Sequence, residues 1–313
     1  MIADVAVPLL LRLQLAGSAA ILLVLLLRPF LRLPLGPELA YRLWWLPPTC
    51  AIASLFPSLA EFRASRFGPV AYTPSAQPGY EWVSALARGL PSGRLLLLIW
   101  ALGAAGFLAV LVWNELKFRK LARQGLAGPA VVGVLWPRIV TPSDYESQFN
   151  ATERDHIRRH ELTHIERRDP HHNLVLAGVR VLFWFNPLIH LAAGAMRLDQ
   201  ELACDAALIE RRPTLRRQYA EALLKAHFIR SNSPLACAWA PLSRHPLELR
   251  VAMIGRPGLT RGQYVARLLA VGALALVMAA GVWGLSPISS SADTGFRWSQ
   301  PHMVAEMDLT PDR

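Results

Sequence analysis

His160, Glu161 and His164 are the residues of this sequence whose types and spacing best suit chemistry. They form a His-Glu-x-x-His pattern, and on a helix the positions i and i+4 lie one above the other on one face. His160 and His164 can therefore bind one metal ion together. Glu161 would lie beside that ion, where its carboxylate can accept a proton from a water molecule that the metal activates. The pattern is typical of helices that hold a catalytic zinc ion for peptide hydrolysis.

The residues around this pattern predict a helix with a recognisable beginning and end. Thr152 with Asp155 resembles an N-terminal capping box, and Asn150 with Glu153 offers a second register. The helix is expected to run to the residue before Pro170, where the proline would stop it. Either histidine alone would be read as a solvated residue on a basic surface helix. That reading explains neither the glutamate between the two histidines nor the acidic helix that follows.

A catalytic zinc site needs a third protein ligand as well as an open position for water. Glu201 and Asp205 lie four residues apart on a later helix, which Asn186 would cap, Pro187 would open and Pro213 would follow. We assign Glu201 as the third ligand and expect Asp205, one turn further on, to orient a ligand histidine. The alternative is an ordinary acidic helix face, and it is a stronger alternative for Asp205 than for Glu201.

Six short motifs occur in an order that matches one known family. They are Val131-Val-Gly133, Pro137-Arg138-Ile139-Val140, His160-Glu161-x-x-His164, Asp169-Pro170, Phe183-Trp184-Phe185-Asn186-Pro187 and Glu201-Leu-Ala-Cys204-Asp205. With them the sequence resembles the BlaR/MecR-type antirepressor family of integral-membrane zinc metallopeptidases, most strongly over residues 130–210. The resemblance implies that His160, His164 and Glu201 bind zinc and that Glu161 is the catalytic base. It also implies a zincin-like (gluzincin) metallopeptidase domain in the cytoplasm.

The composition indicates a membrane protein. The 313 residues are 53% hydrophobic and carry a formal charge of +11, and the mean hydropathy is +0.29. Four segments are long enough to cross a bilayer. They are residues 5–27, closed by Arg28, residues 40–60, residues 95–113 and residues 268–285. We therefore predict a mainly α, polytopic fold divided into three transmembrane helices (1–113), a cytoplasmic peptidase domain (114–264), a fourth transmembrane helix (265–286) and a short outer tail (287–313).

Basic residues predict the orientation of these spans. Lys and Arg residues flank the third and fourth spans on the side of the large region between them, which should therefore be cytoplasmic. An even number of spans then places both termini outside, together with residues 61–94, although four arginines in that loop weaken the bias. Residues 174–196 are apolar too, but a span there would separate His164 from Glu201. We therefore expect a helix, a turn at Asn186-Pro187 and a second helix.

Other segments predict supporting structure. Residues 130–134 and 138–141 read as short strands that can pair as a hairpin, whose edge could bind an extended peptide. Residues 214–229 and 247–254 read as helices. The basic cluster at 211–217 suits solvent or anionic lipid better than nucleic acid. Three scattered cysteines, Cys50, Cys204 and Cys237, predict no disulfide framework, and nothing requires Cys204 to bind metal.

The sequence thus predicts a zinc-dependent metalloendopeptidase. Glu161 would take a proton from water and pass it to the leaving amine. Asp169 and Asp205 are the candidates for orienting the ligand histidines, and Tyr219 and His227 are unranked candidates for stabilising the oxyanion.

The resemblance implies a protein substrate, for which a cytoplasmic transcriptional repressor is the candidate. Only residues 286–313 follow the last span and no Ser-x-x-Lys motif occurs, so we expect no penicillin-binding sensor domain. We expect the lipid bilayer as a partner and no direct contact with nucleic acid, and the oligomeric state is left open. A quality-control protease and a catalytically inert receptor are the alternatives.

Overall fold

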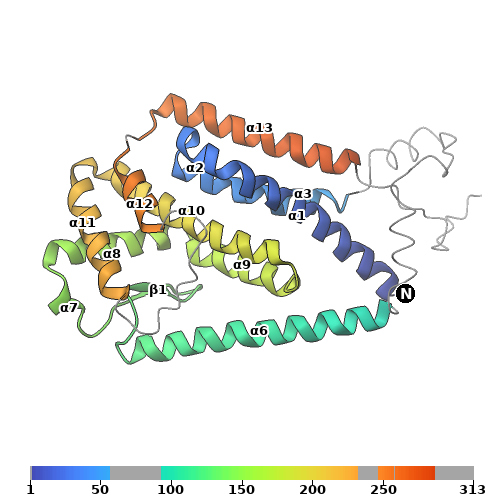
Figure 1. Cartoon of the computed structure of the whole chain (residues 1–313), viewed down its shortest axis with the longest axis horizontal. Helices are drawn as coiled ribbons and strands as arrows, with labels where there is room; N and C mark the ends of the chain where they lie inside the picture. The colour runs from blue at the N-terminus through green and yellow to red at the C-terminus, as the bar shows by residue number, and fades with distance from the viewer. Residues whose placement is uncertain (1, 57–92, 232–245, 257, 286–313) are drawn as a thin grey trace, which may run out of the picture.

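The computed structural model describes residues 2–56, 93–231, 246–256 and 258–285, and it confirms a mainly helical chain with a small β element (Figure 1). In chain order its elements are α1 (Ile2–Leu35), α2 (Pro37–Arg42), the 3-10 helix η1 (Leu43–Trp45), α3 (Leu46–Ala53), α6 (Gly93–Arg123), β1 (Ala130–Val132), β2 (Arg138–Val140), α7 (Tyr145–Gln148), α8 (Ala151–Glu166), α9 (Asp169–Leu182), α10 (Pro187–Arg211), the 3-10 helix η3 (Pro213–Leu215), α11 (Arg216–Ser231), α12 (Pro246–Ile254) and α13 (Arg261–Leu285). Residues 61–92 of the predicted outer loop (61–94), the predicted tail (287–313) and Cys237 lie outside the described residues, and residues 93 and 94 belong to α6.

Three helices in the described part of the chain are long and apolar enough to cross a membrane. They are Leu9–Leu35 within α1, Gly93–Arg123, which is α6, and Arg261–Gly281 within α13. Many of their large apolar side chains are exposed, including Leu26, Leu102 and Leu276. Side chains that face lipid have this character, because the bilayer core is as apolar as leucine itself.

The second predicted span does not form one long helix in the described residues. Residues 40–56 are divided among α2, η1 and α3, and residues 57–60 lie outside the described part. The total of four spans therefore stays a prediction. The helix that carries the first predicted span continues past Arg28 to Leu35, and the end of the span at Arg28 stays a prediction. The helix can continue because Arg28 and Arg32 both reach a buried acidic partner, Asp199 of α10.

The chain turns back after α1 and forms a packed corner with α10. Gly36 makes the turn with φ 79°, a backbone conformation that favours glycine. Leu39 and Leu43 then lie fully buried in a cluster with Val24 of α1 and Ile189 of α10. The long helix α10 therefore rests on the first 45 residues of the chain.

Helix α8 begins at a capping box that its sequence predicts, but it ends earlier than the sequence predicts. Asn150 accepts a hydrogen bond from the Glu153 backbone at 2.9 Å, and the Glu153 side chain accepts one from the Asn150 backbone at 2.8 Å. The second of the two predicted capping registers is therefore the one used, and Thr152 with Asp155 is not the cap. The predicted end is wrong: α8 stops at Glu166. Arg168 adopts a left-handed conformation and Pro170 lies in the first turn of α9. Proline suits a helix start, because its missing N–H needs no partner there.

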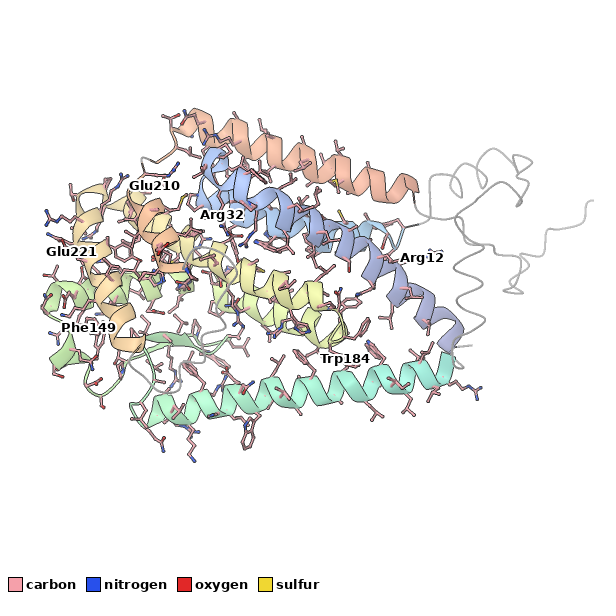
Figure 2. All side chains as sticks on the ribbon, in the orientation of Figure 1. Arg12, Arg32, Phe149, Trp184, Glu210 and Glu221 are labelled. Atoms are coloured by element: carbon pink, nitrogen blue, oxygen red, sulfur yellow. The ribbon has the colours of Figure 1, made fainter. Side chains whose placement is uncertain are left out.

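Helices α9 and α10 form the predicted helical hairpin over residues 174–196. Asn186 caps α10 by accepting a hydrogen bond from the Leu188 backbone at 2.9 Å, and Pro187 follows it. Trp184 lies at the turn and points toward α6, where its indole donates to the Trp100 carbonyl at 3.2 Å (Figure 2). The hairpin returns the chain to α8, so that α8 and α10 can share a site.

The predicted β hairpin is confirmed as an antiparallel pair. Val131 lies opposite Ile139, and the flanking pairs are Ala130 with Val140 and Val132 with Arg138. Figure 1 shows β1 between α8 and α6. The hairpin therefore lies close to the helix that carries the His-Glu-x-x-His pattern.

Candidate metal centre

Helices α8 and α10 bring the three predicted metal ligands to one point. The Nε2 atoms of His160 and His164 are 3.1 Å apart. The carboxylate of Glu201 lies between them, with Oε2 at 3.3 Å from His160 Nε2 and Oε1 at 3.5 Å from His164 Nε2. The i, i+4 spacing on α8 places the two imidazoles together, and the α9–α10 hairpin supplies the carboxylate.

These separations fit a zinc ion. Zinc bound tetrahedrally at about 2.0–2.1 Å from its ligands requires ligand atoms roughly 3.3 Å apart. The separations of 3.1, 3.3 and 3.5 Å bracket that value. The two histidine side chains are 11% and 12% exposed and Glu201 is 36% exposed, so the ligand atoms are sheltered while one side of the group stays open.

Each histidine has a buried carboxylate behind it. Asp169, at the start of α9, lies 2.6 Å from Nδ1 of His164. On the other side, Asp205 accepts a hydrogen bond from the Tyr219 hydroxyl at 2.5 Å, and that hydroxyl lies 2.9 Å from Nδ1 of His160. Both arrangements fix the imidazole orientation and leave Nε2 for the metal. Asp205 therefore acts on His160 mainly through Tyr219, because its own oxygen is 3.4 Å from Nδ1.

Cys204 offers a different third ligand. Its sulfur, His160 and His164 also have potential ligand atoms within 4.8 Å of one another. The sulfur, however, lies 3.4 Å from Nδ1 of His160, the nitrogen that Tyr219 already contacts, rather than beside the Nε2 pair. Burial and the charges of Asp205 and Glu201 raise the pKa of the Cys204 thiol well above its usual value. The geometry therefore favours Glu201, which faces the Nε2 atoms of both histidines.

The charges around the site stabilise an ionised carboxylate. Burial alone would raise the pKa of Glu201, but the hydrogen bond to His160 and the charge of Arg250 hold it below its usual range. Burial alone would lower the pKa of His164, but the hydrogen bond to Asp169 and the charge of Glu201 raise it above its ordinary value. Glu201 is thus held in the ionised form that a carboxylate metal ligand needs, and the carboxylates of Asp169 and Glu201 favour positive charge at His164.

Glu161 and the metal group open into one cavity of about 1510 Å³. Residues 130–134 of the hairpin line it, together with α6 residues such as Leu108 and Leu111 and α9 residues such as Leu174. Glu161 is half-buried within this lining. The cavity therefore places a strand, Glu161 and the three predicted metal ligands along one hollow.

Sequence reasoning missed Arg250, and it left the roles of two other residues open. Arg250 of α12 contacts both Asp205 and Glu201, yet a single arginine in a short helix gives no signal in the sequence. Tyr219 is only 2% exposed, and its hydroxyl faces His160 and Asp205. His227 lies on α11, and its side chain is outside the described residues.

Comparison with known proteins assigns the family. The family model described as BlaR1 peptidase M56 matches residues 8–125 and 121–254. The chain belongs to this family. The M56 chain is 30% identical to the regulatory protein BlaR1 of Bacillus licheniformis over 148 residues, which are 45% of the chain and 24% of BlaR1. It is also 30% identical to the methicillin resistance mecR1 protein of Staphylococcus aureus over 106 residues, which are 33% of the chain and 18% of that protein.

These matches cover a quarter or less of each relative's own length. The family and the candidate spans nevertheless agree on a membrane protein of metallopeptidase type, and the resemblance inferred from the six motifs is confirmed at the level of the family.

Proposed function

We propose that this M56 chain is a membrane zinc metalloendopeptidase that hydrolyses peptide bonds of a cytoplasmic protein. One observation carries the proposal: His160, His164 and Glu201 converge at 3.1–3.5 Å, and they share a cavity with Glu161. Two imidazoles and one carboxylate are the ligand set of His₂Glu zinc peptidases, and the glutamate next to the first histidine is their general base.

In this proposal the residues divide the chemistry among them. His160, His164 and Glu201 hold zinc, which supplies a Lewis acid for the scissile carbonyl and lowers the pKa of water. Glu161 accepts the proton of the attacking water and later donates it to the leaving amine. Asp169 and the pair formed by Tyr219 and Asp205 keep the imidazoles oriented. The cavity beside β1 receives the substrate as an extended chain.

The biological role is proposed from the relatives. The two matched proteins are named as a regulatory protein and a methicillin resistance protein. We infer an antirepressor-type role, in which the substrate is a cytoplasmic transcriptional repressor. We further propose that residues 114–264 lie in the cytoplasm of a bacterial-type inner membrane and that both termini lie outside, as the basic residues predict.

The test compares cells that express the wild-type chain with cells that express Glu161→Gln, and it measures cellular protein fragments by mass spectrometry. Fragments that require Glu161 are expected, and a repressor should be among their sources. Glu166→Gln is the matched control, because Glu166 lies on the same helix but is exposed and, within the part of the chain that the structure describes, pairs only with Arg211. Fragments from many misfolded membrane proteins would indicate quality control instead. The same set of fragments with the wild-type chain and with Glu161→Gln would indicate an inert receptor and contradict the proposal.

A further inference from the structure

Arg250 is the cation closest to the candidate ligand atoms in the described part of the chain. It forms a two-point contact with Asp205, with Nε at 2.8 Å from Oδ2 and Nη2 at 2.9 Å from Oδ1. Its Nη1 lies 3.0 Å from Oε2 of Glu201. The side chain is 16% exposed and lines the same cavity as Glu161, so a bound substrate can reach it.

The hydrogen-bond capacity of this guanidinium is not exhausted by the two carboxylates. Arginine has five N–H bonds in a planar fork. Asp205 takes two and Glu201 takes one. One of the remaining two is on Nη2, which lies 3.5 Å from Nε2 of His160, and the other is on Nη1. Because Nε2 of His160 is the proposed metal-binding atom, both remaining N–H bonds belong to nitrogens on the metal side of the fork.

Tyr219, the other described candidate for stabilising an oxyanion, has less to offer. Its hydroxyl carries a single hydrogen, and Asp205 accepts it at 2.5 Å. The hydroxyl also faces Nδ1 of His160, on the opposite edge of the ring from Nε2. Tyr219 therefore orients His160, and it has no donor left for a substrate.

We propose that Arg250 is a catalytic residue that donates hydrogen bonds to the substrate oxygen on which negative charge develops. The inference rests on the proposed function, and it identifies the hydrogen-bond donor that would stabilise the oxyanion. Water attacks the scissile carbonyl carbon, a C–O bond forms, the C=O π pair moves onto the oxygen, and Glu161 takes the water proton. When the tetrahedral species collapses, C=O re-forms, the C–N bond breaks, and the amine nitrogen receives the proton. Between attack and collapse, the N–H bonds of Arg250 that Asp205 and Glu201 do not use donate hydrogen bonds to the negatively charged oxygen of the tetrahedral species.

The contact with Asp205 explains why this donor can act without rearranging. Asp205 is 2% exposed and accepts hydrogen bonds from both Arg250 and Tyr219. It therefore fixes the guanidinium of Arg250 along the edge formed by Nε and Nη2. Donors that are fixed before the reaction stabilise a developing charge without a reorganisation cost. A lysine ammonium, which is a point charge on a flexible stem, cannot serve Asp205, Glu201 and the substrate together.

The experiment uses the full-length chain in detergent, loaded with zinc, as Arg250→Gln and Arg250→Lys variants. Three quantities are measured: bound zinc, steady-state cleavage of a generic peptide, and the affinity for a peptide phosphonate, a tetrahedral anion that resembles the intermediate. Arg250→Gln should lower kcat by about 10²- to 10³-fold, as loss of one oxyanion donor typically does, with KM changed only a few-fold. Phosphonate affinity should fall in parallel, with zinc retained. Arg250→Lys should recover part of both losses.

Arg211→Gln is the matched control, because Arg211 is exposed and pairs with Glu166, away from the cavity. It should change none of the three quantities. If Arg250→Gln keeps wild-type kcat and phosphonate affinity per zinc-loaded chain, or loses activity only in proportion to lost zinc, the inference is overturned. If that variant does not fold, the Lys variant decides, and wild-type values there overturn the inference equally. A wild-type chain without Glu161-dependent cleavage would instead contradict the proposed function, and the phosphonate measurement would still test Arg250.

Discussion

Single residues around the metal group show what a local pattern can predict and what it cannot. The spacing of His160, Glu161 and His164 requires only one helix, so the sequence suffices to place all three on one face. Glu201 was predicted from the start signals of a second helix together with the need for a third ligand. Arg250 could not be predicted, because its partners Asp205 and Glu201 are more than 40 positions away and only the packing of α12 against α10 joins them.

The ligand and the base should fail differently when each is changed. Glu201→Gln removes a charged ligand, so zinc affinity and activity should fall together. Glu161→Gln keeps every ligand, so zinc should stay while hydrolysis falls by about 10²- to 10⁴-fold, the usual cost of losing a positioned acid–base group. Asp169→Asn should weaken zinc binding by about 10- to 100-fold, because Asp169 holds His164 at 2.6 Å. Zinc content and peptide cleavage on the same preparations test these roles.

The wild-type chain should carry about one zinc ion, and His160→Ala with His164→Ala should remove it. If Glu201→Gln binds zinc as tightly as the wild type while Glu161→Gln loses it, the two roles are wrongly assigned. The third ligand would then be sought at Asp205, at Asp169 or at Cys204, which lies on the other edge of His160.

At the scale of elements, helix identity was easier to predict than helix ends and contacts. The helical hairpin α9–α10 followed from apolar residues interrupted by Asn186-Pro187, since capping chemistry is local. Pro170 was assigned to the end of α8 because proline stops helices, yet it also starts them, and the left-handed Arg168 decides between these roles only in the folded chain. Contacts between elements, such as that of α6 with the α9–α10 turn, leave no periodic signal.

Gly103 sets the approach of α6 to the α9–α10 turn. A Cβ built at Gly103 would overlap the indole of Trp184, whereas one built at Gly106 meets nothing within 4 Å. Gly103→Ala should therefore push α6 away from Trp184 and disturb a wall of the cavity. Overpacking of this kind typically costs about 1–3 kcal/mol. Gly106→Ala is the control and should be tolerated. Thermal unfolding in detergent measures both, and equal behaviour of the two variants would show that the Trp184 contact does not constrain α6.

At the scale of the whole molecule, the peptidase region is not separate from the membrane region. Asp199, two positions before Glu201, is 1% exposed, and its side-chain hydrogen-bond donors among the described residues all lie in the first 45 positions. They are Arg28, Arg32 and the Trp44 indole, the last at 2.8 Å. Figure 2 shows Arg32 inside the molecule, where α1 meets the other helices.

A second connection joins α2 to the site. Glu38 pairs with Arg167, which lies 3.7 Å from Asp169, the partner of His164. The predicted domain boundary at residue 114 was drawn from composition, and composition does not reveal buried ion pairs between distant segments. The helices that carry both kinds of ligand are therefore braced by the N-terminal corner, and the structural unit of the site includes residues 28–44.

The arrangement of the chain across the membrane is the property on which the metal site depends most. His164 and Glu201 can share one ion only if the α9–α10 hairpin enters and leaves on the same side, so positions before and after it should have the same location. Reporter fusions after Arg123 and after Arg211 should both be cytoplasmic, and one after Ser290 should be external, as the basic residues beside α6 and α13 predict. An alkaline phosphatase fusion, which is active only outside, and a fluorescent protein fusion, which matures inside, read the two sides independently at each position. Should the reporters after Arg123 and Arg211 lie on opposite sides, α9 or α10 would cross the bilayer, and the metal site with the function proposed for it would be wrong. Should all three be external, the site would survive, but its substrates would have to be sought outside the cytoplasm.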